Sequence, residues 1–268
     1  MTMKSLRSKY PDWDEPSADN EELCRKFSSA LWTKSEQKLP YRIFLPDTPE
    51  KRVPLVLFLH GADTVGNDNE SHLLLHDIGT FLVRSSWQTR HPAAVLAPQY
   101  DKTMHWAKSD VAESVLLLVR AVLKKYDILD PERVYIYGYS AGGMGTLEYL
   151  KRAPSLFAGA VVICGATYED HLDLLAETPI WLLHAEDDRI VSPGKSPGFG
   201  VQYYGSTALY DTLHEKMGDR LYYTKYPTGE MKEKYHLNPH CAWVPAGKDM
   251  PVWYWLFTQK KKKHEEVI

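Results

Sequence analysis

Short, continuous apolar runs that end in Gly or Pro, or at a histidine, recur along this chain, separated by segments of helical pattern. A run of this kind is typical of a strand that is buried on both faces of a sheet. Strands that alternate with helices at this spacing predict an α/β fold, with a mostly parallel central sheet that helices cover on both faces. The clearest runs are residues 53–61 (VPLVLFLHG), 93–98 (AAVLAP), 133–138 (RVYIYG), 159–165 (GAVVICG) and 179–184 (PIWLLH).

Further strands and several helices complete the pattern. Residues 41–46 predict a short strand, and residues 220–227 alternate in polarity, which places that strand nearer a sheet edge. Asp110 and Glu113 suit a capping box at the start of one helix. The expected helices cover residues 73–86, 110–127, 140–152, 206–217 and 251–259.

The length of 268 residues fits a single α/β domain. We expect a polar N-terminal arm over residues 1–40, with one helix at 20–31. The α/β domain covers residues 41–268, with a small cap or loop insertion near 192–215. The N-terminus has no apolar segment of the signal-peptide type, so the expected location is the cytoplasm unless a leader has been removed.

Net charge, the length of the apolar runs and the cysteine content argue against several classes of protein. The net charge of −3 gives no electrostatic reason to expect nucleic acid or an anionic membrane. No run approaches the roughly 20 apolar residues of a membrane helix. The three cysteines include no CxxC pair and do not suggest a disulfide framework. The oligomeric state is not indicated by the sequence.

Residues 138–142 read GYSAG, a GxSxG motif between an expected strand and an expected helix. In this context the serine lies on a tight strand-to-helix turn that exposes its hydroxyl above the sheet edge. The motif therefore predicts Ser140 as a nucleophile. The alternative is a glycine-rich turn in which Ser140 is an ordinary N-cap.

The residues HGAD at 60–63 end the longest buried run and predict an oxyanion hole. The loop after such a strand provides one amide donor, and the residue after the nucleophile provides the other. We assign the donors to Ala62, with Gly61 as the alternative, and to Ala141. His60 is interpreted as a buried histidine that orders the loop.

The segment HAEDDRIV at 184–191 follows an expected strand and offers three carboxylates. The pattern His-small-x-x-Asp-x-x-Val predicts Asp188 as the acid that would fix the tautomer of a histidine base. Asp187 is the alternative acid, and otherwise a carboxylate that caps the loop.

The base is expected last in chain order, in the loop KYHLNPHCAW. We prefer His240 over His236 because His240 lies closest to the final helix, and we set aside His264 in the charged tail. The spacing of His236 and His240 also suits a metal pair, but Pro239 interrupts a helix there and no HExxH motif is present. No metal is expected, and Cys241 is interpreted as core packing.

Two loops are expected to shape the substrate site. Aromatic residues in the segment 99–106 favour an apolar or ring-bearing acyl group, although the same side chains suit core packing. Residues 192–205 (SPGKSPGFGVQYYG) are too rich in Gly and Pro for a helix and predict a loop or small cap. The candidate substrate contacts are Gly61, Tyr100, Trp106 and Tyr139.

Four blocks together resemble the esterases and predicted peptidases near polyhydroxybutyrate depolymerases and feruloyl esterases. They are LFLHGADTVGNDN, YIYGYSAGGMGTLEYLKRAPSLFAGAVVICG, TPIWLLHAEDDRIV and HCAWVPAGKDMPVWYWLF, within residues 41–257. The resemblance implies an α/β-hydrolase fold, a triad of Ser140, Asp188 and His240, and Ala62 in the oxyanion hole. Some relatives carry an extra N-terminal β-domain. The short arm stands in its place here, so the oligomer contacts of those relatives are not carried over.

These observations predict a serine hydrolase that cleaves carboxylic esters through an acyl-enzyme, without a cofactor. The expected substrate is a small-molecule or oligosaccharide ester, and the resemblance alone implies a feruloyl or acetyl ester of plant polysaccharide. A serine peptidase or amidase would use the same triad. A non-catalytic binding protein on the same fold is the alternative from another class, and such proteins usually lack part of the triad.

Overall fold

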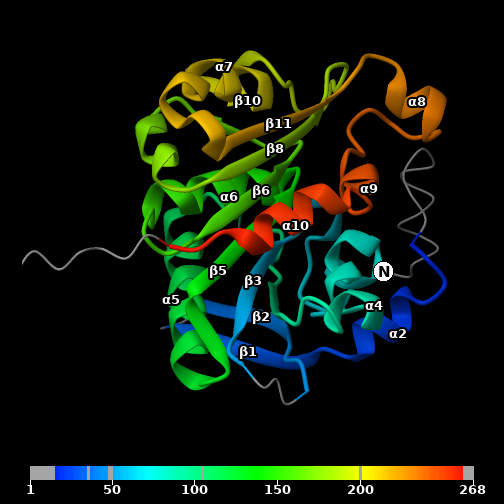
Figure 1. Ribbon diagram of the computed structural model, residues 1–268, viewed down its shortest axis with the longest axis vertical. Coiled ribbons are helices and arrows are strands. Elements are labelled where there is room, and N and C mark those ends of the chain that lie inside the picture. The colour runs from blue at the N-terminus through cyan, green and yellow to red at the C-terminus, as the bar shows by residue number, and fades with distance from the viewer. Residues whose placement is uncertain (1–15, 35–36, 48–50, 104, 199–200, 262–268) are drawn as a thin grey trace, which may run out of the picture.

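A computed structural model describes residues 16–34, 37–47, 51–103, 105–198 and 201–261. Over these residues, eight strands form one main sheet in the order β1-β2-β4-β3-β5-β6-β8-β11 (Figure 1). The strands from β4 to β11 run parallel, whereas β2 pairs antiparallel with both β1 and β4. The expected α/β architecture is confirmed. The strands are β1 (Ser28–Lys34), β2 (Gln37–Phe44), β3 (Val53–Leu59), β4 (Ala94–Pro98), β5 (Leu129–Tyr139), β6 (Gly159–Ile163), β8 (Ile180–Ala185) and β11 (Leu221–Tyr226).

Helices lie on both faces of this sheet. One apolar cluster joins the sheet to α5, α6 and α7, and a second joins its other face to α2, α9, α10 and the segment between β3 and β4. None of the described helices is long and apolar enough to cross a membrane. The helices are α2 (Asn20–Arg25), α3 (Ser71–Leu74), α4 (Ser85–Gln88), α5 (Ser109–Lys125), α6 (Ala141–Arg152), α7 (Ser206–Met217), α8 (Glu230–Lys234), α9 (Trp243–Ala246) and α10 (Met250–Thr258).

The two-residue period of a strand divides the core between these clusters. In β3, Leu55 and Leu57 belong to the cluster with α5 and α6, whereas Val56 and Phe58 belong to the cluster with α10. All four side chains are buried, which explains why β3 reads as an unbroken apolar run. Burial on both faces fixes the register of each strand. Because these strands are parallel, the polar residues that follow them lie together at one edge of the sheet.

The N-terminal region differs from the expected irregular arm. The helix α2 ends at Arg25 instead of residue 31, and β1 and β2 then form one end of the main sheet. A boundary at residue 40 would cut through β2. Alternate side chains of β1 are exposed because it is an edge strand, so its sequence SSALWTK lacks the apolar run of a central strand. Residues 1–15 and 35–36 of the expected arm lie outside the described residues.

The expected helix over residues 73–86 is broken into α3, α4 and two 3₁₀ turns, η2 (Asp77–Gly79) and η3 (Phe81–Val83). The side-chain amide of Asn20 donates to the Leu73 and Leu74 carbonyls at 3.0 Å each, so α2 uses acceptors that a continuing helix would need. The capping box of the next helix is also absent: α5 begins at Ser109, and its N-cap residue Lys108 makes no side-chain cap hydrogen bond.

The segment expected to be a loop or small cap contains two strands, β9 (Lys195–Gly198) and β10 (Val201–Gly205). Together with β7 (Ala166–Tyr168) they form a second sheet in the order β7-β10-β9. Pro197 is tolerated because β9 is an outer strand of this sheet. Residues 199 and 200 lie outside the described part of the chain. Since β7 closely follows β6, and β9 follows the loop after β8, this small sheet is attached at the carboxyl edge of the main sheet.

Candidate active site

Ser140 occupies a strained turn between β5 and α6. Its backbone has φ 53° and ψ −120°, a conformation that costs a residue other than glycine about 1–3 kcal/mol. The turn requires very close packing between α6 and the end of β3. A Cβ at Gly142 would lie 1.9 Å from the Leu59 carbonyl oxygen, so only glycine fits there. The GYSAG motif therefore forms the strand-to-helix turn that its sequence predicts.

Three residues from separate elements meet in one hydrogen-bonded chain. Ser140 follows β5, Asp188 lies in the loop after β8, and His240 lies between β11 and α9. Ser140 Oγ is 2.9 Å from His240 Nε2, and His240 Nδ1 is 2.7 Å from Asp188 Oδ2. The sequence predicts this trio, and the structure brings its members together although they are up to 100 residues apart.

The hydrogen bonds around Asp188 indicate that it is ionised. Oδ1 accepts from the backbone amides of Ile190 and Val191, at 2.8 and 3.1 Å. Oδ2 accepts from His240 and also from His184 Nε2, at 3.1 Å. Burial alone would raise the pKa of Asp188, but the hydrogen bonds and charge interactions with the two histidines outweigh it and hold that pKa well below its usual range. An ionised carboxylate only accepts hydrogen bonds, so the Nδ1 atom of His240 carries a proton. When the ring is neutral, its Nε2 atom accepts the hydrogen bond that the Ser140 hydroxyl donates.

His184 is a member of this network that the sequence interpretation did not assign. It is the last residue but one of β8 and is fully buried. Its Nε2 lies within hydrogen-bond distance of both Asp188 Oδ2 and the Val191 carbonyl, and its Nδ1 lies 2.9 Å from Ser206 Oγ. The signal was present, because His184 stands four residues before Asp188 in the pattern that identified the acid.

The neighbouring carboxylates have other partners. Asp187 Oδ2 accepts from the Gly229 amide at 3.0 Å, and Glu186 accepts from the Thr228 amide at 3.1 Å. Glu186 also forms an ion pair with Lys225. Both side chains therefore hold the turn after β11, as expected for loop-capping carboxylates, and Asp188 is the one that reaches His240.

The other residues of the base loop are placed away from this chain of contacts. His236 is exposed and has a positive φ of 57°, whereas His240 is buried. Cys241 is fully buried among core side chains. Among the residues that the structure describes, no group of three or more His, Cys, Asp or Glu side chains is arranged to hold a metal ion.

The two expected oxyanion donors occupy equivalent positions in helical turns. Ala141 is the first residue of α6, and Ala62 is the first residue of the 3₁₀ turn η1 (Ala62–Thr64). The N–H groups in the first turn of a helix have no acceptor within that helix. They point outward from its N-terminus, which is the positive end of the helix dipole. His60 lies behind this loop as a neutral buried ring: its Nδ1 contacts the Gly61 carbonyl at 2.7 Å, and the Tyr100 amide donates to its Nε2 at 3.4 Å.

The aromatic residues proposed as substrate contacts are core side chains instead. Tyr100, Trp106 and Tyr139 are at most 2% exposed. Trp106 donates to the His60 carbonyl at 2.9 Å, and Tyr100 stacks on the His60 ring. They support the loop that carries Ala62 from behind, and Gly61 is buried with them. Sequence favoured them because they follow a strand at its carboxyl end, but that position does not determine which way a side chain points.

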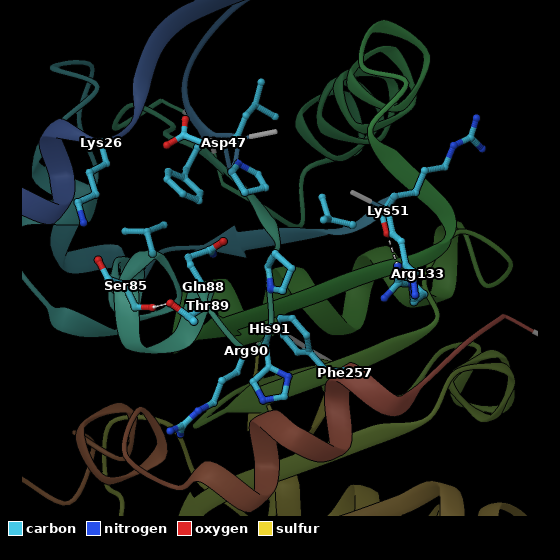
Figure 2. A pocket seen from close by; sticks show the side chains of 17 residues that line it. Lys26, Asp47, Lys51, Ser85, Gln88, Thr89, Arg90, His91, Arg133 and Phe257 are labelled. Atoms are coloured by element: carbon cyan, nitrogen blue, oxygen red, sulfur yellow. Dashed lines mark hydrogen bonds between the residues drawn. The ribbon is translucent and has the colours of Figure 1, made fainter. Parts of the chain in front are cut away.

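A cavity of about 1270 Å³ lies at the opposite edge of the main sheet (Figure 2). It is lined by residues around the amino ends of β3 and β4, among them Lys51, Arg90 and His91. Its side chains come from neither the Ser140 turn nor the loop of Asp188. The hydrogen-bonded residues Ser140, His240 and Asp188 lie at the carboxyl ends of the strands, and none of them lines this cavity.

Several known proteins are similar to this chain in sequence or in fold. A protein from Nocardia uniformis subsp. tsuyamanensis, NocK, whose name assigns it to the esterases, is 28% identical over 152 residues, covering 53% of this chain and 41% of NocK. The solved structure of a thermostable esterase is 30% identical, with a TM-score of 0.79, and the match covers 89% of this chain and 64% of that one. The acylaminoacyl peptidase of Pyrococcus horikoshii, at 16% identity and a TM-score of 0.62, shares the fold over 94% of this chain and 45% of its own length. The chain thus spans less than two thirds of the length of each of these relatives.

A protein-family model also matches the sequence of this chain. The model of the esterase PHB depolymerase family matches residues 39–178, which include β3, the Ala62 turn, β5 and the Ser140 turn. The match covers more than half of the 268 residues. The chain belongs to the esterase PHB depolymerase family.

Proposed function

We propose that this protein hydrolyses carboxylic esters through an acyl-enzyme formed on Ser140. The observation that carries the proposal is the continuous chain from Ser140 Oγ through His240 to the buried Asp188, with distances of 2.9 and 2.7 Å. Membership of an esterase family and similarity to a thermostable esterase support the same reaction.

In the first half of the reaction, Ser140 Oγ forms a bond to the ester carbonyl carbon while its proton moves to His240 Nε2. The carbonyl oxygen becomes an oxyanion that accepts hydrogen bonds from the Ala62 and Ala141 amides. The bond to the leaving alkoxide then breaks, and His240 returns its proton to that oxygen. Asp188 keeps the proton of His240 on Nδ1 and stabilises the imidazolium.

In the second half, water attacks the acyl-enzyme carbonyl and gives a proton to His240 Nε2. The bond to Ser140 Oγ breaks, and the proton passes from His240 to Oγ. The carboxylic acid leaves and the serine is restored. Every proton that His240 accepts is given back, so the cycle needs no co-reactant other than water.

For the natural substrate we propose a small-molecule or oligosaccharide ester, with a feruloyl or acetyl ester of plant polysaccharide as the first candidate. The resemblance of the catalytic blocks to feruloyl esterases supports this choice. The small sheet of β7, β10 and β9 beside the carboxyl edge is the element expected to vary with the acyl group, because loops at this edge determine specificity in such folds.

A panel of p-nitrophenyl acetate, butyrate, a longer acyl ester and a feruloyl ester, measured beside a matched p-nitroanilide, tests the proposal. We expect hydrolysis of at least one ester with a kcat/KM well above that of the anilide. A higher kcat/KM for the anilide than for every ester would indicate a serine peptidase or amidase with the same triad, in place of an esterase. Absence of turnover with every substrate in a folded preparation would contradict the proposal.

A further inference from the structure

A second buried Asp–His pair lies beside the catalytic residues and takes no part in the steps above. Asp63 follows Ala62 in η1, and its Oδ2 lies 2.5 Å from His76 Nε2. The two side chains are at most 3% exposed. Burying a carboxylate costs several kcal/mol unless its partners compensate, so the placement of Asp63 depends on the groups around it.

Tyr139 joins this pair to the strand that carries the nucleophile. Its hydroxyl donates to Asp63 Oδ1 at 3.0 Å, and it directly precedes Ser140. The contact is close, because a Cβ at Gly61 would lie 2.4 Å from Tyr139 Cε2 and 2.6 Å from Asp63 Oδ1. The loop that presents Ala62 is therefore held against the end of β5 on both sides of Ala62.

The same cluster reaches the base. The ring of His76 packs on Trp243 with 5.2 Å between centroids, and Trp243 meets the His240 ring edge-on at 5.6 Å. Tyr139 also packs on Trp243, at 4.7 Å. One buried group of side chains thus contacts the oxyanion loop, the residue before the nucleophile and the aromatic ring beside the base.

We propose that Asp63, His76 and Tyr139 are positioning residues that fix the Ala62 amide relative to Ser140 Oγ. Ala62 itself is exposed, so the loop needs anchors on its buried side. An oxyanion donor is effective only at a short distance from the developing charge, and it must be held there before the reaction. The hydrogen bonds from His76 and Tyr139 also disperse the negative charge of Asp63, which would otherwise oppose the nearby oxyanion. This inference rests on the oxyanion role proposed for Ala62.

The test compares Tyr139→Phe with Tyr137→Phe. Tyr137 lies two residues earlier on the same face of β5, and its buried hydroxyl donates to the Ile78 carbonyl at 2.8 Å. Each variant keeps its ring and loses one buried hydrogen bond, which Tyr139 makes to a carboxylate and Tyr137 makes to a backbone carbonyl. Tyr139→Phe should lower kcat for an accepted p-nitrophenyl ester by roughly tenfold to a hundredfold with little change in KM, the effect of a small displacement at the reacting centre. Tyr137→Phe should keep the wild-type kcat.

Hydrogen exchange gives a readout that does not depend on turnover. Tyr139→Phe should speed amide exchange in the peptide that contains Ala62 and Asp63, and Tyr137→Phe should not. Asp63→Asn, which keeps the side-chain shape, should act in the same direction at equal or larger size. Equal kcat and equal exchange in the two tyrosine variants at matched Tm would overturn the inference, as would a rise in KM alone. An inactive wild type would instead refute the proposed function, and the exchange comparison would still decide the role of the cluster.

Discussion

His184 and His240 bind the same carboxylate oxygen from two sides: their Nε2 and Nδ1 atoms lie 3.1 and 2.7 Å from Asp188 Oδ2. The other ring nitrogen of His240 lies within hydrogen-bond distance of Ser140 Oγ, whereas that of His184 lies within hydrogen-bond distance of Ser206 Oγ at the start of α7. The proposed acid, Asp188, is therefore fixed both to the His240 ring beside Ser140 and to the start of α7. The backbone amides after it hold its second oxygen, so all the positions at which Asp188 accepts hydrogen bonds are used.

Removing the histidine on the scaffold side should impair catalysis without abolishing it. In His184→Leu, Asp188 keeps three of its donors but gains freedom to rotate. We expect a loss of roughly tenfold to a hundredfold in kcat, the equivalent of one hydrogen bond to a charged group. His184→Gln can still donate to Asp188 from Nε2 and should recover part of the loss. Steady-state kinetics and Tm for both variants check this, and equal losses in the two would show a role in packing alone.

The two adjacent aspartates should respond very differently to the same change. Asp188→Asn should lower kcat by about four orders of magnitude, because an amide no longer selects the correct tautomer of His240. Asp187→Asn keeps an acceptor for the Gly229 amide and should stay close to wild type. Measurement of kcat for the pair is sufficient, and the reverse order of effects would move the acid to Asp187.

The sequence predicts the fold, and it predicts that Ser140, Asp188 and His240 come together, because both depend on patterns along the chain. Strands such as β3 are apolar on both faces, and the residues after them must then meet at one edge of the sheet. The chain order of serine, acid and base is similarly fixed by the fold. These features need no knowledge of how any single side chain is oriented.

Features that depend on orientation were not accessible in this way. Tyr100, Trp106 and Tyr139 stand where substrate contacts are expected, yet they turn into the core. The bond between Asp63 and Tyr139 joins residues 76 positions apart and has no signal in the pattern. The edge strand β1 was missed because its exposed side chains remove the apolar run on which strand prediction relies.

Two buried histidines should make the fold sensitive to acid. Burial lowers the pKa of His60 to about 4 and that of His72 to about 3, whereas histidine in an unfolded chain titrates near about 6.5. Between these values the unfolded state binds more protons, so their contribution makes the free energy of unfolding fall as the pH falls. The two together should lower it by about 2–3 kcal/mol between about pH 7.5 and about pH 5.5.

Urea unfolding between about pH 7.5 and about pH 5.5 measures this decrease in the free energy of unfolding. Imidazole NMR signals, assigned with a His72→Gln variant, measure its cause. Neither the His60 nor the His72 ring should titrate above about pH 5, since both remain neutral while the protein is folded. Titration of either ring near about pH 6.5 in the folded protein would contradict this account of their burial.

The histidines of the base loop separate a serine mechanism from a metal-dependent one. His240→Ala should remove the main activity, because it deletes the proposed general base. His236→Ala should leave most of the activity, because its side chain is exposed and outside the triad. EDTA should have no effect, since the proposed nucleophile is a side-chain oxygen. Loss on chelation that zinc restores would contradict the serine mechanism.

The most direct test of the central claim is covalent labelling of the nucleophile. A fluorophosphonate probe should modify the wild-type protein once, at Ser140, as located by mass spectrometry of the digested chain. Ser140→Ala should keep the wild-type Tm, take up no probe and lose ester hydrolysis, by up to about a millionfold as for triad losses in a well-studied serine protease. Labelling at another residue, or more than a few per cent of the activity in Ser140→Ala, would contradict the account.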